Sequence, residues 1–316
     1  MTRVGVVGLG IMGRRIATTL ANAGMSVTAF DVSQDAMDRA RDAELQLEPS
    51  LADLAAKSDV VLLSLPTPAV VLDVVGQIQS TGHPVVVLDT STIDPDTARA
   101  CRDILVAVGM DYADCPILGR PDAVGQWTVP VGGSVDAAAT ASEVLAPLAR
   151  AVLPVGEVGA ASTIKVLNNL MLGTINAITA EVLLLAEAAG VDPGVFVDVV
   201  IDSGAASVSG LFTDAAARAV GGDFTPTFSL RLMHKDNRLA LAMAESYGIP
   251  LIVGSAAQTL NTMALASGHG DEDSIAVLKA LEVLTGLQAR RHAKSPEHKR
   301  TRRGESGFSD PAPWVT

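Results

Sequence analysis

Aromatic residues, cysteines and charged side chains are all scarce in this chain of 316 residues. Aromatic residues make up only 3%, so the core must be built mainly from Ala, Val, Leu and Ile, which suits helices packed on both faces of a sheet. Two cysteines are too few for a disulfide framework or an all-cysteine zinc site, and the five scattered histidines lack metal-ligand spacing. We therefore expect an α/β protein without a metal site.

Positive charge is also in short supply, and it is unevenly spread. The formal net charge of −12 argues against a general nucleic-acid binder. Residues 290–316 hold seven Lys or Arg against three acids, a net +4, which leaves −16 for residues 1–289. We expect this proline-containing basic tail to be extended or partly disordered, and contact with an acidic partner subunit is its alternative role.

Long uninterrupted apolar runs are missing as well. Asn, Glu, Gly or Pro breaks the most apolar stretches before about 18 residues, so we expect no membrane span. The N-terminus enters a strand pattern at once and has no signal-peptide layout. We expect a soluble, cytoplasmic protein.

Strand and helix patterns alternate in the first half of the chain, which predicts parallel βαβ units with right-handed crossovers. Near residue 156 the pattern changes, and a helix is expected from about 160 to 189, followed by helices only. We therefore predict a Rossmann-type doubly wound parallel sheet in residues 1–156, joined by a long helix to an all-helical domain in residues 157–289. The strands expected in the first half span residues 3–7, 27–30, 59–64 and 85–88.

A glycine-rich turn follows the first expected strand and opens the first expected helix. In this setting the pattern G-x-G-x-x-G predicts a dinucleotide site. The first glycine permits the tight turn, the second lets a pyrophosphate approach the backbone, and the third allows close helix–strand packing, while the helix N-terminus attracts the phosphates. The cofactor contacts predicted in this turn are Gly8, Leu9, Gly10, Ile11, Met12 and Gly13.

An acidic residue stands where such a fold contacts the adenosine ribose. Asp31 ends the second expected strand, 18 residues after Gly13. A carboxylate at this place accepts a hydrogen bond from the ribose 2′-hydroxyl and repels a 2′-phosphate, so NAD is favoured over NADP. Arg14 and Arg15 lie near enough in sequence to keep NADP open as the alternative.

The carboxyl ends of the next two expected strands line the same crevice in a doubly wound sheet. Leu65 and Pro66 follow the strand at 59–64, and we expect them to flank the dinucleotide. Thr92 follows the next strand, and we expect it to reach the nicotinamide or the substrate. Its alternative role is to cap the following helix, a role that Asp94 can also fill.

Four separate blocks resemble the β-hydroxyacid dehydrogenases, the group that includes 3-hydroxyisobutyrate dehydrogenase and tartronate semialdehyde reductase. The resemblance covers roughly residues 3–289. It implies a reversible, NAD(P)-dependent oxidation of a small β-hydroxyacid to its semialdehyde or keto form, and a homodimer or homotetramer assembled through the helical domain. The four blocks are residues 4–13, 114–119 and 159–169, and the pair Lys235–Asp236.

The third block carries the candidate catalytic residues. Lys165 and Asn169 are four positions apart and share one face of the expected long helix. A lysine facing a cleft in this apolar segment would have a lowered pKa, suited to proton exchange near neutral pH. The resemblance implies that Lys165 exchanges a proton with the substrate, that Asn169 holds the substrate, and that Lys235 contacts the cofactor from the helical side. The alternatives are a snorkelling surface lysine at 165 and a surface charge pair between Lys235 and Asp236.

The second block departs from the family pattern. Leu118 stands where the family has a serine and Arg120 where it has a second glycine, on either side of Gly119. A guanidinium binds carboxylate, phosphonate or sulfonate groups, so we expect Arg120 to contact an anionic substrate group or the cofactor, unless it only pairs with Asp122. The substrate contacts predicted in all are Thr92, Leu118, Gly119, Arg120, Lys165 and Asn169.

Two other functions stay open because the substrate block is altered. One is a reductase of a non-acid carbonyl or an imine. The other is a scaffold that binds a dinucleotide without turnover, against which the pair Lys165 and Asn169 argues.

Overall fold

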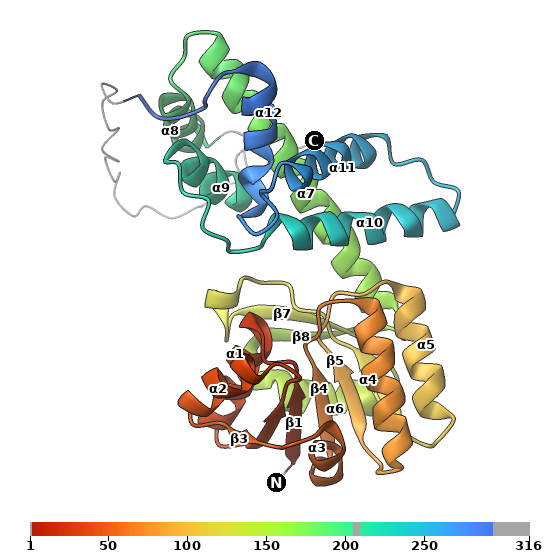
Figure 1. Cartoon of the computed structure of the whole chain (residues 1–316). Coiled ribbons are helices and arrows are strands. Elements are labelled where there is room, and N and C mark those ends of the chain that lie inside the picture. The colour runs from red at the N-terminus through yellow and green to blue at the C-terminus, as the bar shows by residue number, and fades with distance from the viewer. Residues whose placement is uncertain (1, 205–208, 293–316) are drawn as a thin grey trace, which may run out of the picture.

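An eight-stranded sheet forms the first half of the chain in a computed structural model that describes residues 2–204 and 209–292 (Figure 1). Its strand order is β3-β2-β1-β4-β5-β6-β7-β8. The strands are β1 (Arg3–Val7), β2 (Ser26–Phe30), β3 (Gln46–Leu47), β4 (Val60–Leu63), β5 (Val86–Asp89), β6 (Asp111–Asp114), β7 (Trp127–Gly132) and β8 (Ala149–Gly156). The helices around it are α1 (Ile11–Asn22), α2 (Gln34–Asp42), α3 (Leu51–Lys57), α4 (Pro68–Thr81), α5 (Pro95–Val106) and α6 (Val135–Leu145), with 3₁₀ turns η1 (Pro121–Ala123) and η2 (Ala146–Leu148).

Two apolar clusters, one on each face of the sheet, explain why its central strands are continuous apolar runs. Val6 and Leu62 point into one cluster, whereas Val7 and Leu63 point into the other. Because both faces are covered by helices, every side chain of such a strand is buried. Because β1, β2, β4, β5 and β6 are parallel, their carboxyl ends meet at one edge of the sheet, which faces the helical half (Figure 1).

The last two strands differ from the predicted all-parallel sheet. β7 pairs with β6 in the antiparallel sense, and β8 is parallel to β7. The connection from Asp114 to Trp127 holds only the short turn η1. A parallel return is usually made through a crossover helix, and residues 115–126 contain no α-helix, so this connection brings the chain back antiparallel.

Helices alone make up the described part of the second half, as predicted. The long connecting helix α7 (Ala160–Ala188) rises from the sheet and runs through the helical domain (Figure 1). Around it pack α9, α10, α11 and α12, and α8 packs against both α7 and α9. Their bounds are α8 (Pro193–Ser203), α9 (Gly210–Val220), α10 (Leu230–Ser246), α11 (Ile252–Ala266), η3 (Ser274–Ala276) and α12 (Val277–Thr285).

Helix α7 corrects the expectation that no segment is apolar enough to cross a membrane. By length and composition alone its 29 residues pass that test. Its buried face carries two amides, however: Asn169 donates to Asp236 and Asn176 donates to Ser274. A helix with partners of this kind is the central core helix of the second domain.

The predicted basic tail begins as part of the helical domain. Arg290 pairs with Glu282 at 2.5 Å, and Arg291 pairs with Asp198 at 2.8 Å. The rest of the predicted tail, residues 293–316, lies outside the described residues.

Candidate active site

The glycine-rich turn between β1 and α1 is fixed by close backbone contacts at two glycines and open at the third. Gly8 has φ +92°, and a Cβ on Gly13 would overlap the Gly8 carbonyl oxygen. Beside Gly10, by contrast, a Cβ would meet no atom within 4 Å. The turn is therefore closely packed at Gly8 and Gly13, whereas the space beside Gly10 is open and could hold a pyrophosphate.

Asp31 lies beside this turn. Its carboxylate accepts hydrogen bonds from the backbone N–H of Leu9 at 2.6 Å and of Ser33 at 2.8 Å. Each carboxylate oxygen keeps a second acceptor position, which suits a ribose hydroxyl. Ile11, in the first turn of α1, is 66% exposed although it is apolar. Leu9 is buried, so the exposed part of the turn is Gly10 and Ile11, which together with the carboxylate fit the adenosine half of a dinucleotide.

The loops after β4 and β5 are tied together at the same edge of the sheet. The N–H of Leu65 donates to the Ser91 hydroxyl at 2.9 Å. Pro66 is exposed next to Leu65. Asp94, not Thr92, caps α5, because its carboxylate accepts from the N–H of Thr97 at 2.9 Å. Thr92 instead presents its carbonyl oxygen to the helical domain.

A buried carboxylate stands behind these loops. Asp89 is 1% exposed and accepts from the N–H of Ser91 at 2.8 Å and from the Tyr112 hydroxyl at 3.0 Å. Burial raises the pKa of Asp89 to about 6, and the hydrogen bonds from Ser91 and Tyr112 oppose that rise. The group positions the loop that ends at Thr92.

Lys165 reaches from the second turn of α7 to the substrate block. Its Nζ donates to the carbonyl oxygen of Ile117 at 2.8 Å. Burial lowers the pKa of Lys165 below its ordinary value of 10.5; the charge of Asp236 opposes this shift, and the charge of Lys235 adds to it. An amine with a lowered pKa exchanges protons nearer to neutral pH than an ordinary lysine.

Asn169 lies one helical turn beyond Lys165 and joins a chain of polar contacts between α7 and α10. Its amide donates to Asp236 at 2.6 Å and accepts from Asn168 at 3.1 Å. Asp236 is 1% exposed and pairs with Lys235 at 2.9 Å, so this pair is no surface pair. Lys235 also donates to the carbonyl oxygen of Thr92 at 3.0 Å, which links the helical domain to the loop after β5.

The loop that holds the remaining predicted substrate contacts is pinned by a tryptophan. Trp127 is fully buried, and its indole N–H donates to the carbonyl oxygen of Arg120 at 2.7 Å. A Cβ on Gly119 would overlap the Trp127 ring, so the glycine is needed for this packing. Leu118 forms a backbone bridge to Thr128. Trp127 therefore belongs to the core, and it fixes the backbone of residues 118–120, which include the predicted substrate contacts.

Arg120 spans the two domains. Its guanidinium lies 3.0 Å from the carboxylate of Asp214 on α9 and 3.7 Å from that of Asp122. The Arg120 side chain is 54% exposed, so the pair with Asp214 is open to competition from other anions. Sequence reasoning named Asp122 but missed Asp214, because a contact between residues 94 positions apart leaves no local signal.

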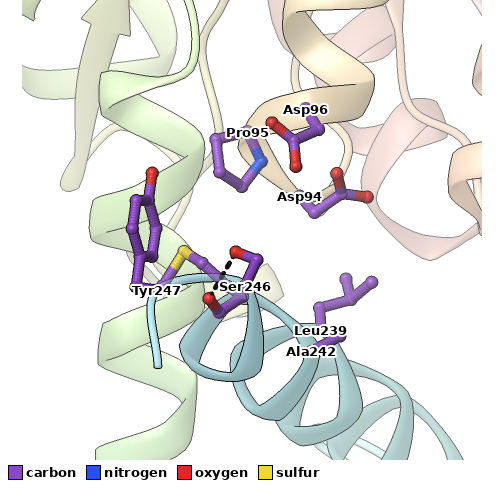
Figure 2. Close-up of a pocket in the computed structure, with 8 residues that line it drawn as sticks. Asp94, Pro95, Asp96, Leu239, Ala242, Ser246 and Tyr247 are labelled. Atoms are coloured by element: carbon purple, nitrogen blue, oxygen red, sulfur yellow. Dashed lines mark hydrogen bonds between the residues drawn. The ribbon is translucent and has the colours of Figure 1, made fainter. Parts of the chain in front are cut away.

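A pocket of about 130 Å³ lies between the start of α5 and the end of α10 (Figure 2). No residue predicted to bind cofactor or substrate lines it. Its lining residues are Asp94, Pro95, Asp96, Leu239, Ala242, Met243, Ser246 and Tyr247.

Two family models match consecutive parts of the chain. The NAD-binding domain of 6-phosphogluconate dehydrogenase matches residues 3–156. The NAD-binding domain of NADP-dependent 3-hydroxyisobutyrate dehydrogenase matches residues 159–281.

Individual relatives match over most of their length. The L-threonate dehydrogenase of Cupriavidus necator is 33% identical, over 87% of this chain and 95% of its own. The 3-sulfolactaldehyde reductase of Escherichia coli is 29% identical, over 92% of this chain and 99% of its own. A structure of Mycobacterium tuberculosis 3-hydroxyisobutyrate dehydrogenase with L-serine superposes with a TM-score of 0.80, at 29% identity, over 89% of this chain and 99% of that one.

Proposed function

We propose a substrate and a proton carrier for this chain, which belongs to the β-hydroxyacid dehydrogenase family and is an NAD(P)-dependent dehydrogenase of CH–OH groups. The proposed substrate is a small anionic β-hydroxyacid, and Lys165 exchanges the substrate proton. The observation that carries this proposal is the position of Lys165: its amine lies at the substrate block, with a lowered pKa and with Asp236 near enough to act on its charge. The nicotinamide, when bound, supplies or accepts the hydride.

NAD is the proposed cofactor. Asp31 stands beside Leu9 at the turn, where its carboxylate suits a ribose hydroxyl and repels a 2′-phosphate. The free space at Gly10 and the N–H groups at the start of α1 would hold the pyrophosphate. Leu65 and Pro66 would flank the dinucleotide, and Lys235, bound to the Thr92 carbonyl, would close the cleft over it.

Lys165 acts as the proton carrier in both directions. In oxidation its neutral amine takes the proton of the substrate hydroxyl, and in reduction its ammonium returns that proton to the carbonyl oxygen. Burial favours the neutral amine, while Asp236 stabilises the ammonium that forms. Asn169 would contact the substrate through the amide N–H that Asp236 leaves free.

The substrate loop supplies the anion contact. Leu118 offers no hydroxyl, so the donors proposed for the anionic group are the N–H of Gly119 and the guanidinium of Arg120. Asp214 holds that guanidinium at 3.0 Å, and a substrate carboxylate or sulfonate would compete with it. The relatives that act on L-threonate and 3-sulfolactaldehyde support substrates of this charge.

A spectrophotometric screen tests the proposed substrate class. L-Threonate, 3-hydroxyisobutyrate and L-serine are assayed with NAD and with NADP, and 3-sulfolactaldehyde with NADH. The methyl ester of 3-hydroxyisobutyrate is the matched neutral compound. We expect turnover of at least one acid with NAD, and a kcat/KM for 3-hydroxyisobutyrate at least about tenfold above that for its ester, because one charge-assisted contact contributes about 1.5–3 kcal/mol.

Preference for the ester or for a cyclic imine would overturn the anionic substrate, and it would favour the reductase of a non-acid carbonyl or imine. Binding of NAD without turnover of any alcohol would favour the scaffold. Arg120→Ala should raise KM for the acids and leave the ester unchanged; unaltered kinetics on the acids would remove Arg120 from the substrate site.

Lys165→Met tests the proton carrier. We expect kcat to fall by about a hundredfold to ten-thousandfold, because that is the usual contribution of a positioned acid or base. NAD affinity should be retained. Lys57→Met is the matched control and should leave kcat unaltered, because Lys57 stands on α3, which carries none of the residues proposed for the site, and pairs with Glu48 at 2.7 Å. Full turnover in Lys165→Met would contradict the mechanism.

We also propose that the protein works as a cytoplasmic homodimer or homotetramer assembled through α7. An exposed apolar stripe supports this assembly, because its members follow one another at three, four or seven residues and so lie along one side of the helix. Light scattering after size-exclusion chromatography measures the assembly, and a monomer at micromolar concentration would contradict it. The stripe consists of Ile164, Leu167, Met171, Ile178 and Leu185.

A further inference from the structure

The first turn of α7 has no capping side chain of its own. Its N-cap residue is Gly159, with φ +96° and no side chain to accept a hydrogen bond. Four N–H groups at the start of a helix lack intrahelical partners, and in a buried position each needs an acceptor. The acceptor here comes from the end of β6.

Asp114 supplies it with both oxygens of one carboxylate. Oδ1 accepts from the N–H of Gly159 at 2.9 Å, and Oδ2 accepts from the N–H of Ser162 at 2.6 Å. These are the two N–H groups that a capping box satisfies with two separate side chains. The negative charge also lies at the positive end of the helix dipole. One carboxylate from a distant strand thus accepts both hydrogen bonds that a capping box would accept from within the helix.

The same contact sets the register of α7 against the substrate block. Asp114 bonds to Ser162, and three residues later in both segments Ile117 accepts from Lys165 at 2.8 Å. Both bonds therefore join residues 48 positions apart in sequence. If α7 slid or rotated relative to residues 114–117, both bonds would lengthen together.

Asp114 is buried, and its carboxylate contacts α7 rather than a ligand. It is 1% exposed, and both of its oxygens are engaged with α7, so it does not face the substrate. A Cβ on Gly132 would overlap Asp114 Oδ1 and lie 2.8 Å from the Glu157 carbonyl oxygen, so the carboxylate fills its site completely. Burial raises the pKa of Asp114, and the N–H groups of Gly159 and Ser162 oppose that rise.

We propose that Asp114 is a positioning residue for the proton transfer, which holds Lys165 at the reacting atoms by capping α7. This inference rests on the role proposed for Lys165. Asp114 stands first in the block that resembles the family's substrate-binding block, yet it acts on the helix rather than on the substrate.

Asp114→Asn is the direct test. An asparagine keeps the shape but replaces one acceptor by an N–H donor, which faces an N–H group of α7. We expect kcat with the best acid of the screen to fall by about tenfold to a hundredfold, because small displacements of a catalytic group have effects of this size. The KM for NAD should stay within about twofold. Hydrogen exchange in residues 160–166 should speed up.

Ser50→Ala is the matched control, because it removes the cap of α3, where Ser50 Oγ accepts from the N–H of Asp53 at 3.1 Å. Such a loss costs about 1 kcal/mol of stability, and kcat should not change. If Asp114→Asn does not fold, Gly132→Ala keeps the carboxylate but displaces it, and the same fall in kcat is expected.

The outcomes separate this inference from the proposed function. Wild-type kcat in Asp114→Asn, together with an inactive Lys165→Met, overturns the positioning role alone. Full activity in Lys165→Met overturns the proton carrier itself. An equal fall of kcat in Ser50→Ala would mean that Asp114 acts only through general stability, which also overturns the positioning role.

Discussion

The two halves of the molecule contribute to the candidate active site by different means. The sheet domain offers mainly backbone: the turn from Gly8 to Gly13, the N–H groups at the start of α1, and the carbonyl oxygens of Ile117 and Thr92. The helical domain offers side chains, which meet across α7 and α10. Substitutions that add a side-chain atom should therefore disturb the sheet domain most. Substitutions that remove a hydrogen-bond or ion-pair partner should disturb the helical domain most.

The buried polar groups follow the same division. Among the described residues, the buried amide atoms that lack a hydrogen-bond partner belong to Asn176, Asn237 and Asn261, on α7, α10 and α11. A buried polar atom without a partner costs free energy of folding. The helical half thus keeps polar groups in its core at some cost to stability, whereas the sheet is packed with aliphatic side chains.

Two glycine substitutions in the sheet domain are expected to have the largest effects on stability and on NAD binding. Gly13→Ala places a Cβ against the Gly8 carbonyl oxygen, and it should lower the free energy of unfolding by about 3–5 kcal/mol. Gly10→Ala adds a Cβ in open space, so the stability of the free protein should change by less than about 0.5 kcal/mol while NAD binds at least about tenfold more weakly.

Urea unfolding and calorimetric titration with NAD measure these two effects. Unimpaired NAD binding in Gly10→Ala would mean that the pyrophosphate does not lie at this turn.

The next effect concerns Asp89, the buried carboxylate that breaks the aliphatic pattern of the sheet domain. Its pKa in the folded protein is about 6 against an ordinary 3.8, so the folded state holds the proton more tightly than the unfolded chain. The protonated Asp89 carboxyl contributes its full stabilisation below pH 3.8, and this stabilisation is lost as the pH rises through about 6. Relative to Asp89→Asn, the wild type should lose on the order of 3 kcal/mol between these limits.

Urea unfolding of both proteins across this pH range measures the difference, which also cancels the contributions of other groups. Parallel pH profiles would show that Asp89 does not titrate in this window.

The smallest effects are expected from the amides of α7. Asn169→Ala removes the amide that donates to Asp236, and Asn176→Ala removes the amide that donates to Ser274. Each should cost about 1–3 kcal/mol of stability, as a buried group loses its hydrogen bond. Only Asn169→Ala should also lower kcat/KM. An equal loss of activity in both variants would mean that the two amides serve packing alike.

Local patterns predicted one half of the site better than the other. The turn from Gly8 to Gly13 and Asp31, directly after β2, lie within one βαβ unit, so their arrangement follows from spacing alone. The spacing of Lys165 and Asn169 likewise placed both on one face of α7. These features depend on contacts between near neighbours in sequence.

Contacts between distant segments were out of reach. The antiparallel return of β7, the pair Arg120–Asp214 and the link from Asn169 to Asp236 each join residues whose partners only tertiary packing selects. Asp114 was visible as a motif residue, but its hydrogen bonds to α7 depend on how the helix docks on β6.

Helix α7 belongs to both halves, and this separates the position of the Lys165 amine from the charges that act on it. Its 29 residues span about 43 Å, and it packs on β6, β7, β8 and α5 as well as on the other helices. Lys165, in the second turn, is therefore anchored to the sheet domain, where Ile117 accepts from its amine. Asp236 and Lys235, whose charges act on that amine, stand on α10 in the helical domain. A movement between the two halves would therefore change the proton affinity of the amine while the amine itself stays in place.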